Sequence, residues 1–299
     1  MKTLVVIAGP TGVGKTKTGI RIAQHFKTEI ISADSRQIFI ETNIGTAVPS
    51  HEELSQVPHH LIQTRHVWDY YNAWMFEQDA LAIADEIFKT HDVALLVGGS
   101  GLYIDAVCSG IDEIPDIEPE LRAKVNEQYL NEGIESLRQT LKFLDPDYYE
   151  IVDIQNPVRL KRAIEICIQT GKPYSQLRKE QSRERPFRII KLALNLPREE
   201  LYERINRRVD EMVAAGLEDE VRSLIPQKEC MALKTVGYRE FFDYFDNLTS
   251  KEEAIEKIKQ NTRKYAKKQI SWLKRDASVQ WFSPFNEEKI IAYIEEKMS

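Results

Sequence analysis

The strongest constraint on the fold is a glycine-rich octapeptide near the amino end. Residues 9–16 read GPTGVGKT and match G-x-x-x-x-G-K-[ST] at every fixed position. An apolar run from Thr3 to Ala8 precedes it, and a helical pattern from Lys15 to His25 follows it. A strand, a glycine-rich turn and a helix in this order form a phosphate-binding loop (P-loop), because backbone N–H groups and the positive end of the helix dipole face one anion. We therefore predict a phosphorylated ligand here, with Lys15 supplying charge and Thr16 a hydroxyl for Mg²⁺.

The apolar segments after this loop predict an α/β fold. Continuous apolar runs that alternate with helical patterns are typical of a parallel sheet covered on both faces. Strands are expected at 29–33, 93–97, 188–196 and 279–282. Helices are expected at 74–89, 198–215 and 251–274, with a further helix at the carboxyl end. The predicted class is α/β, a P-loop NTPase-like parallel sheet with helices on both faces.

The sequence changes character between the third and fourth expected strands. The stretch IDEIPDIEPE at 111–120 is acidic and contains Pro115 and Pro119, as a domain boundary often does. From about residue 118 to 185 the chain contains helical patterns and no strand candidate. We predict an all-helical domain at 116–187, inserted into a core made of residues 1–115 and 188–299.

Positive charge is concentrated in two segments, although the net charge of the chain is −6. Residues 155–191 contain ten basic residues and three acids, and residues 257–275 contain eight basic residues and no acid. Tyr265 and Trp272 lie within the second segment. Either patch alone fits a solvated helix face as well as a phosphate-binding surface. Two patches in a P-loop protein favour a nucleic-acid substrate.

The residues at the strand ends argue against ATP hydrolysis. ATP hydrolases usually carry a metal-binding Asp at the end of a later strand, but here the run at 93–97 is followed by Gly98-Gly99-Ser100. Asp34 instead follows the run at 29–33 and is expected at the carboxyl edge of the sheet, as a general base, an outer metal partner or a turn residue. Arg204 and Arg208 share a helix face, which suits phosphate binding or salt bridges to neighbouring Glu residues.

The remaining composition indicates a cytoplasmic protein. Cys108, Cys167 and Cys230 are far apart and form no disulfide or metal pattern, so each is expected to be a small buried residue in a reducing compartment. The pair at 59–60, His59-His60, has no third ligand at suitable spacing and is expected to have a structural or hydrogen-bonding role. No apolar run approaches the roughly 18 residues that span a bilayer. We expect a monomer that does not bind membranes.

Nine segments taken together resemble the bacterial tRNA dimethylallyltransferases. They occur in that family's order and cover nearly the whole chain. DSRQ, GGSGLY, GYRE and RKYAKKQISWLKR in combination are far more specific than a P-loop alone. The matching segments are GPTGVGKT (9–16), ISADSRQIF (31–39), NIGTA (43–47), PHHLI (58–62), LLVGGSGLYIDA (95–106), NPVRLKRAIEI (156–166), LYERINRRVDEMVAAGLEDEV (201–221), KTVGYREF (234–241) and KKQISWLKRD with WF (267–276, 281–282).

The resemblance implies a reaction. Dimethylallyl diphosphate donates its five-carbon group to N6 of the adenosine immediately 3′ of the tRNA anticodon, diphosphate leaves and Mg²⁺ assists. Asp34 corresponds to the general base, and Ser100 stands where the family usually has Thr, near the reacting centre. Arg208, favoured over Arg204, corresponds to the diphosphate-binding arginine. The residues implied to hold diphosphate, with Thr16 also a metal ligand, are Gly9, Pro10, Thr11, Gly12, Val13, Gly14, Lys15 and Thr16.

The resemblance also implies tRNA contacts and places the anticodon stem-loop on the helical insert. Asn43 and Val48 stand where the family usually has Asp and Lys, and Phe39 where Tyr is common, so the contacts of the 39–48 stretch depart from the family pattern. The implied tRNA contacts are Asp34, Ser35, Arg36, Gln37, Ser100, Arg122, Val158, Arg159, Leu160, Lys161, Arg162, Lys234, Thr235, Val236, Gly237, Tyr238 and Arg239.

Two other functions compete with prenyl transfer. A small-molecule or nucleotide kinase would use the same P-loop for ATP, and labelling of a metabolite by ATP without tRNA would indicate it. An RNA-binding protein with a regulatory P-loop would bind tRNA tightly without turning over dimethylallyl diphosphate.

Overall fold

The computed structural model describes residues 1–113, 115–178 and 183–299 and separates the chain into two compact units. Unit 1 comprises Met1–Ser109 and Glu184–Ser299, and unit 2 comprises Gly110–Arg183. The sequence prediction placed the insert at 116–187, so both boundaries lie a few residues earlier in the structure.

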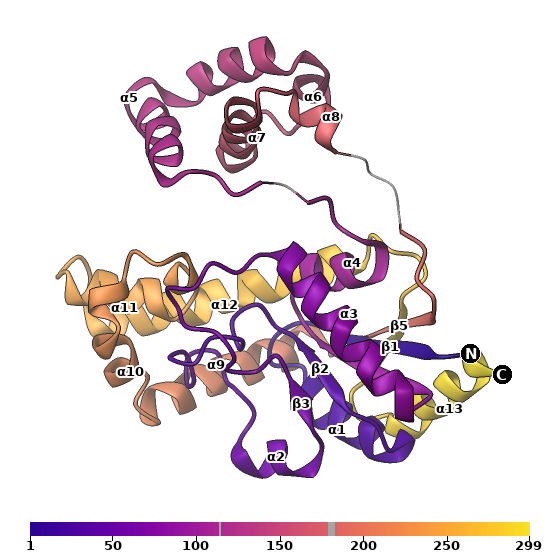
Figure 1. Ribbon diagram of the computed structural model, residues 1–299. Helices are drawn as coiled ribbons and strands as arrows, with labels where there is room; N and C mark the ends of the chain where they lie inside the picture. Colours follow the sequence, from indigo (N-terminus) through magenta and orange to yellow (C-terminus); the bar gives the residue numbers. More distant parts are fainter. Residues whose placement is uncertain (114, 179–182) are drawn as a thin grey trace. The chain divides into compact units, whose positions relative to one another are not determined.

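Unit 1 is built on a six-stranded sheet with the order β3-β2-β4-β1-β5-β6, and every pairing is parallel (Figure 1). This confirms the predicted α/β fold. Of the six strands in this sheet, the short strand β3 is the one that was not predicted, because two residues give no periodic pattern. The strands are β1 (Thr3–Ala8), β2 (Ile30–Ala33), β3 (His59–His60), β4 (Val93–Gly98), β5 (Arg188–Leu194) and β6 (Gln280–Phe282).

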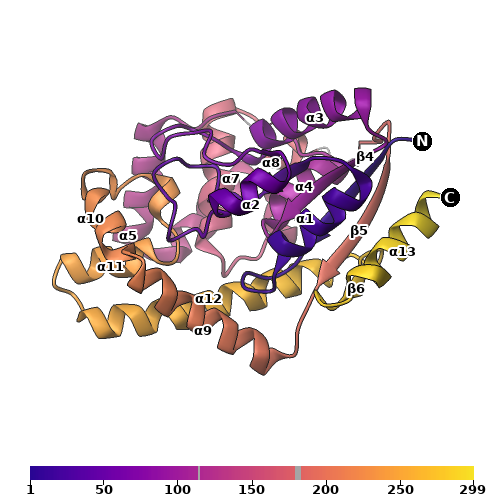
Figure 2. The ribbon, with the colours of Figure 1, turned by 90° about the horizontal axis from the view of Figure 1, so that it is seen from below.

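Helices cover the sheet and extend beyond its carboxyl edge. In Figures 1 and 2 the long helix α12 runs beside α9, against which it packs. The 3₁₀ turns Ile225–Gln227 and Met231–Leu233 precede α11. The helices of unit 1 are α1 (Lys15–Phe26), α2 (His51–Gln56), α3 (Ala73–Thr90), α4 (Gly101–Ser109), α9 (Arg198–Ala214), α10 (Leu217–Ser223), α11 (Tyr238–Phe245), α12 (Lys251–Leu273) and α13 (Glu287–Met298).

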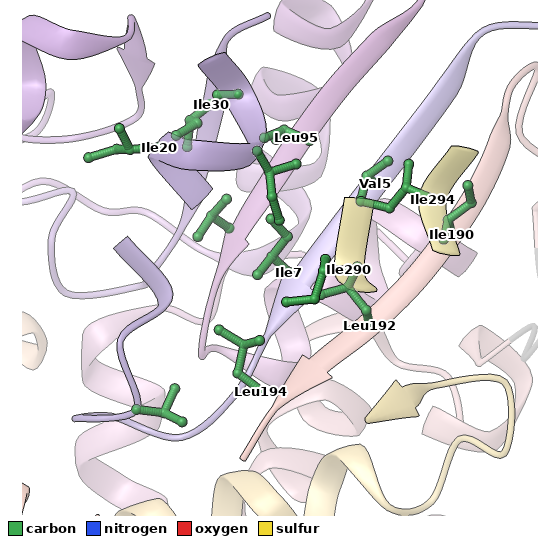
Figure 3. Close-up of a cluster of buried hydrophobic side chains, with 14 of the residues drawn as sticks. Val5, Ile7, Ile20, Ile30, Leu95, Ile190, Leu192, Leu194, Ile290 and Ile294 are labelled. Carbon is green, nitrogen blue, oxygen red and sulfur yellow. The ribbon is translucent and has the colours of Figure 1, made fainter. Parts of the chain in front are cut away.

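Alternate residues of the central strands form the main core on one face of the sheet (Figure 3). Val5 and Ile7 of β1 pack there with Leu192 of β5 and with Ile290 and Ile294 of α13, and none of them is solvent-exposed. Each such side chain contributes about 1.5–3 kcal/mol by leaving water. The core therefore holds β1 rigidly, and with it the loop that follows.

Unit 2 consists of helices, and its described residues contain no strand. The longest, α5 (Pro119–Leu144), is broken at Gly133, whose backbone is not helical. The core of unit 2 includes Leu137, Leu141 and Leu160. The carboxylate of Asp145 is buried; Oδ1 accepts the Tyr148 N–H and Oδ2 accepts the Ser175 N–H, which ties the unit together. The other helices are α6 (Pro146–Ile151), α7 (Pro157–Thr170) and α8 (Tyr174–Leu177).

Arg185 explains why unit 1 resumes before β5. Its Nη2 donates to Glu77 Oε1 of α3 at 2.7 Å, and its guanidinium also donates to the backbone oxygens of Ala106 and Val107 at 2.8 Å. The side chains of Arg185 and Glu77 are 8% and 0% exposed. Arg185 therefore forms a buried ion pair and is not part of an exposed basic surface, although it was counted in the basic patch at 155–191.

We expect Arg185→Ala to lower the free energy of unfolding of unit 1 by about 3–5 kcal/mol, because it removes the guanidinium from a buried carboxylate. Urea denaturation followed by circular dichroism measures the change. Lys89→Ala breaks the exposed Lys89–Glu86 pair and should cost less than about 1 kcal/mol. Equal losses for the two variants would contradict a structural role for Arg185.

Candidate active site

Three loops meet at the carboxyl edge of the sheet because their strands are neighbours in register. Gly98 of β4 pairs with Ala8 of β1 on one side and with Ala33 of β2 on the other. The P-loop after β1, Asp34 after β2 and Ser100 after β4 therefore start at the same level. This is the position at which open α/β sheets bind ligands.

The P-loop presents backbone N–H groups to one point. Gly12 and Gly14 have φ values of 80° and 106°, which only glycine adopts without strain. Gly14 caps α1 and no side chain caps the helix, so the first N–H groups of α1 remain available to an anion. The Lys15 ammonium donates to the Pro10 carbonyl oxygen at 2.9 Å. This local geometry is compatible with an anion site, and the binding of a phosphorylated ligand there stays a prediction.

A cavity of about 530 Å³, here called the P-loop pocket, opens beside this loop. Its lining includes the cations Lys15, Arg204, Arg207 and Arg208, together with Thr16, which is proposed to bind metal. Another part of the wall is apolar. Such a pocket suits a small ligand with an anionic head and a short hydrocarbon tail. The apolar lining residues are Ile30, Ala47, Val48, Pro49, Ile62 and Val97.

A second cavity of about 560 Å³, here called the lysine pocket, lies beside the first. It is lined by basic residues from several elements, together with Tyr265, which is 42% exposed. Four residues line both cavities, namely Thr11, Asp34, Thr46 and Arg208. The two pockets therefore meet at the Asp34 carboxylate. The basic residues are Arg36, Arg208 of α9, Lys234, Arg239 of α11, and Lys264, Lys267 and Lys268 of α12.

Asp34 has one oxygen engaged and one available. Its Oδ1 accepts the Arg36 N–H at 2.9 Å, which makes it a turn residue as well. Among the described residues nothing donates a hydrogen bond to Oδ2. Beside it, Ser100 Oγ accepts the Ser35 N–H at 2.9 Å and donates to Ser35 Oγ at 3.1 Å. Ser100 thus holds the neighbour of Asp34, and Asp34 itself lines both cavities.

The arginines of α9 differ in burial. Arg208 Nη1 donates to Thr11 Oγ1 at 3.4 Å, and burial lowers its pKa while Asp34 opposes this shift. Arg204 lies 6.0 Å from the Phe285 ring centre. Arg207, 72% exposed, pairs with Glu211. Arg204 and Arg208 both line the P-loop pocket, so the structure brings both predicted arginines to the same site.

Two residues of the predicted tRNA-contacting segments have buried side chains. Leu160 and Tyr238 are both 0% exposed, and the Tyr238 hydroxyl donates to Glu220 Oε1 at 2.6 Å. Their side chains belong to the cores and are not available to RNA. Their neighbours Arg159 and Lys234 are exposed and remain predicted contacts.

Sequence analysis missed the role of Glu220. Its carboxylate accepts the backbone N–H groups of Asn43, Ile44 and Gly45 as well as the Tyr238 hydroxyl. It thereby fixes the loop in which Thr46 lines both pockets and residues 47–50 line the P-loop pocket. No signal in the sequence links Glu220 to a loop that lies about 175 residues earlier.

The predicted contacts on the insert lie together within unit 2. Burial raises the pKa of Glu165 on α7. The charges of Arg122 on α5 and of Lys161 and Arg162 on α7 oppose this shift, so all three lie near Glu165. Val158 nearby is 69% exposed. Three predicted cations therefore form one basic cluster although α5 and α7 are separate in the sequence.

Parts of the two basic patches are used for folding. Lys191 pairs with Asp276 at 2.7 Å, and Lys259 pairs with Asp210 at 2.8 Å. Lys179 lies outside the described residues. Arg185, Lys191 and Lys259 therefore form ion pairs within the fold, which a count of charges does not show.

The cysteines and histidines mostly match expectation. Cys108 and Cys167 are buried, whereas Cys230 is only partly buried. His60 Nε2 lies 2.6 Å from Glu29 Oε2, and His59 lines the P-loop pocket with its pKa lowered by burial.

Across the described ranges there is no group of three or more His, Cys, Asp or Glu suited to a metal. Nor is any helix there long and apolar enough to cross a membrane.

Residues 37–276 match the family model described as IPP transferase. Among curated proteins, the tRNA dimethylallyltransferase 1 of Bacteroides thetaiotaomicron is 51% identical over 294 residues, which cover 98% of this chain and 96% of that protein. The tRNA dimethylallyltransferase of Christiangramia forsetii is 48% identical over 99% of this chain and 98% of its own.

Solved structures give the same result. The full-length tRNA isopentenylpyrophosphate transferase of Bacillus halodurans superposes with a TM-score of 0.73 at 34% identity, covering 99% of this chain and 97% of that one. A eukaryotic dimethylallyltransferase acting on tRNA superposes with a TM-score of 0.74 at 27% identity, covering 91% of this chain and 70% of that one.

Proposed function

We propose that this chain, which belongs to the IPP transferase family, transfers the dimethylallyl group of dimethylallyl diphosphate to N6 of the adenosine 3′-adjacent to the anticodon in tRNA. Diphosphate is the second product. The observation that carries the proposal is the meeting of two pockets at Asp34, one suited to a small anion with an apolar tail and one lined by lysines.

The donor binds in the P-loop pocket. Its diphosphate lies on residues 9–16, where Lys15 and the N–H groups of α1 neutralise it, and Arg208 supplies a further charge. The five-carbon tail lies against the apolar wall that includes Ile30 and Val97. Groups placed around the departing diphosphate stabilise charge that develops as the C–O bond breaks, which is where such groups lower the barrier most.

The acceptor adenine enters from the lysine pocket, where Tyr265 offers a ring on which a base can stack. As N6 forms a bond to C1 of the donor, the C1–O bond breaks and its electron pair leaves with diphosphate. The N6 proton passes to Asp34 Oδ2. Proton removal matters because an exocyclic amine on adenine is a poor nucleophile. The base must leave its stack to reach Asp34, and a single-stranded loop makes this easier.

The family typically uses a divalent metal, and the residues present fit Mg²⁺. Thr16 lines the P-loop pocket and offers its hydroxyl oxygen as a ligand. Mg²⁺ commonly takes few protein ligands and completes its shell with phosphate oxygens and water. When bound, it would neutralise charge on the leaving diphosphate.

The proposed RNA surface has two parts. In unit 1 it comprises Lys234–Arg239 together with residues 34–37. In unit 2 it comprises Arg122 and residues 158–162, so that this helical insert holds the anticodon stem-loop. Phosphate contacts of this kind give an affinity for tRNA that falls steeply with salt concentration.

We further propose that the protein acts as a monomer in the cytoplasm.

We expect donor affinity to fall at alkaline pH. Burial, with Arg208 adding to it and Asp34 opposing it, lowers the pKa of Lys15 to about 8. A bound diphosphate raises this pKa, so binding above that pH takes up a proton. Affinity is therefore full below pH 8 and then decreases by up to about tenfold per pH unit.

Titration calorimetry with dimethylallyl diphosphate between about pH 7 and pH 9.5 measures this slope. Lys15→Arg keeps its charge throughout that range and should remove the decrease. A wild-type affinity independent of pH would show that Lys15 does not contact the diphosphate.

The test of the function uses the protein, Mg²⁺, bulk tRNA and dimethylallyl diphosphate labelled in its hydrocarbon part. After digestion, the label should be found on N6 of one adenosine per modified tRNA. Label that remains in the diphosphate fraction would contradict the proposal. A parallel reaction with γ-labelled ATP and a metabolite extract, without tRNA, tests the kinase alternative.

A further inference from the structure

One buried carboxamide bonds to two loops of the site. Gln269 on α12 is 7% exposed. Its Oε1 accepts the Thr11 N–H of the P-loop at 2.9 Å, and its Nε2 donates to the Gly99 carbonyl oxygen at 2.8 Å. The two bonds join a helix near the carboxyl end of the chain to the loops after β1 and β4.

On the P-loop side, Gln269 acts on a residue that lines both pockets. The Thr11 N–H donates to Gln269, and the Thr11 hydroxyl accepts a hydrogen bond from Arg208. Its N–H is therefore not offered to the donor. Gln269 instead holds the first turn of the P-loop in place and leaves the N–H groups of α1 to bind the anion.

On the other side, Gln269 acts on the residue before Ser100. Gly99 accepts its hydrogen bond, and Ser100 in turn holds Ser35, the neighbour of Asp34. A continuous path of hydrogen bonds and peptide links thus leads from the P-loop through Gln269 to the proposed base.

The loops approach one another closely at Gly99. A Cβ atom there would lie 2.3 Å from Gln269 Nε2, 3.2 Å from the Gly9 carbonyl oxygen and 3.4 Å from Lys15 Nζ. Any larger residue at this position would displace the Gln269 side chain and crowd the Gly9 carbonyl oxygen. The spacing between the loops is therefore set by direct contact, and Gln269 and Lys15 both lie beside that contact.

Only a side chain that both accepts and donates satisfies this arrangement. The carboxamide has one acceptor oxygen and one donor nitrogen. Glutamate has only acceptors and would place a carboxylate against the Gly99 carbonyl oxygen. Leucine has neither group and would leave the Thr11 N–H and the Gly99 carbonyl without their partner.

We propose that Gln269 is a positioning residue. It fixes the distance between the P-loop, where the donor's diphosphate binds, and the loop after β4, whose Ser100 holds the neighbour of Asp34. The inference rests on the proposed function, since it concerns the geometry of that reaction. Because a misplacement of about 1 Å can cost about 10²-fold in rate, the side chain acts on turnover more than on binding.

Gln269→Leu should lower kcat by about 10- to 100-fold, with KM for dimethylallyl diphosphate and Kd for tRNA changed by less than about threefold. Gln78→Leu replaces an exposed glutamine on α3 and should leave kcat unchanged. Melting temperatures show whether each variant is folded at the assay temperature.

Gln269→Asn is the second variant. Its shorter carboxamide keeps one acceptor and one donor but does not reach both the Thr11 N–H and the Gly99 carbonyl oxygen, so kcat should again fall by about 10- to 100-fold. KM for dimethylallyl diphosphate and Kd for tRNA should again change by less than about threefold, a split between kcat and binding that a merely structural defect would not produce.

Wild-type protein in the same assay separates the two proposals. A wild type without turnover contradicts the function, whereas an active wild type whose two Gln269 variants keep kcat within about threefold overturns the positioning role. Hydrogen exchange of the Thr11 amide in the unliganded wild type is independent of variant folding. Slow exchange is expected there, and exchange at the rate of an open loop would also overturn the inference.

Discussion

Replacing Asp34 with asparagine is expected to lower kcat for prenyl transfer by a factor of about 10²–10⁴, the usual contribution of a general base. The amide keeps an oxygen that can accept the Arg36 N–H, so the turn should persist. It does not accept the N6 proton, however. Steady-state kinetics with saturating tRNA measure kcat, and filter binding measures the Kd for tRNA, which should change by less than about threefold.

Asp92→Asn is the matched control for this variant. Asp92 precedes β4 at the opposite edge of the same sheet, is 82% exposed and pairs with Lys2. An exposed pair of this kind contributes less than about 1 kcal/mol, so kcat should not change. Parallel losses of kcat and tRNA affinity in Asp34→Asn would contradict its role as a base and leave it as an RNA contact.

Arg208→Ala is expected to lower kcat/KM for dimethylallyl diphosphate by about 10²–10³. Removing one group that stabilises a developing negative charge typically has an effect of this size. Arg208 is partly buried where both pockets meet, and Asp34 lies near enough to affect its pKa. Arg204 lines only the P-loop pocket, so Arg204→Ala should have the smaller effect.

Arg198→Ala controls for the loss of a cation from α9. Arg198 is exposed at the first turn of the helix, 5.1 Å from the Tyr202 ring centre, and lines neither cavity. Its kcat/KM should equal that of the wild type. A larger loss in Arg204→Ala than in Arg208→Ala would reverse the assignment of the diphosphate-binding arginine.

The local parts of this site were predictable from sequence. A strand, the loop at 9–16 and a helix are consecutive, so their geometry follows from neighbouring residues alone. The position of Asp34 followed from one further rule, that parallel strands end at the same edge. The register of β2, β4 and β1 confirms it.

Contacts between distant segments were not predictable. Gln269 and Glu220 bond to loops roughly 170 residues away or more, and a single sequence contains no trace of such pairings. Arg185 looked like part of a basic surface because charge counts do not show that Glu77 is buried beside it. Likewise, the predicted RNA-contacting segments included the core residues Leu160 and Tyr238, since a contiguous motif mixes exposed and buried positions.

The most direct test of the account is a crystal structure of the protein with a thiolo analogue of dimethylallyl diphosphate and a short anticodon stem-loop RNA. We predict the diphosphate against the α1 N–H groups and Lys15, with C1 of the donor between it and the adenine N6, and N6 within hydrogen-bonding distance of Asp34 Oδ2. A diphosphate bound away from Lys15, or an adenine that does not reach Asp34, would contradict the mechanism.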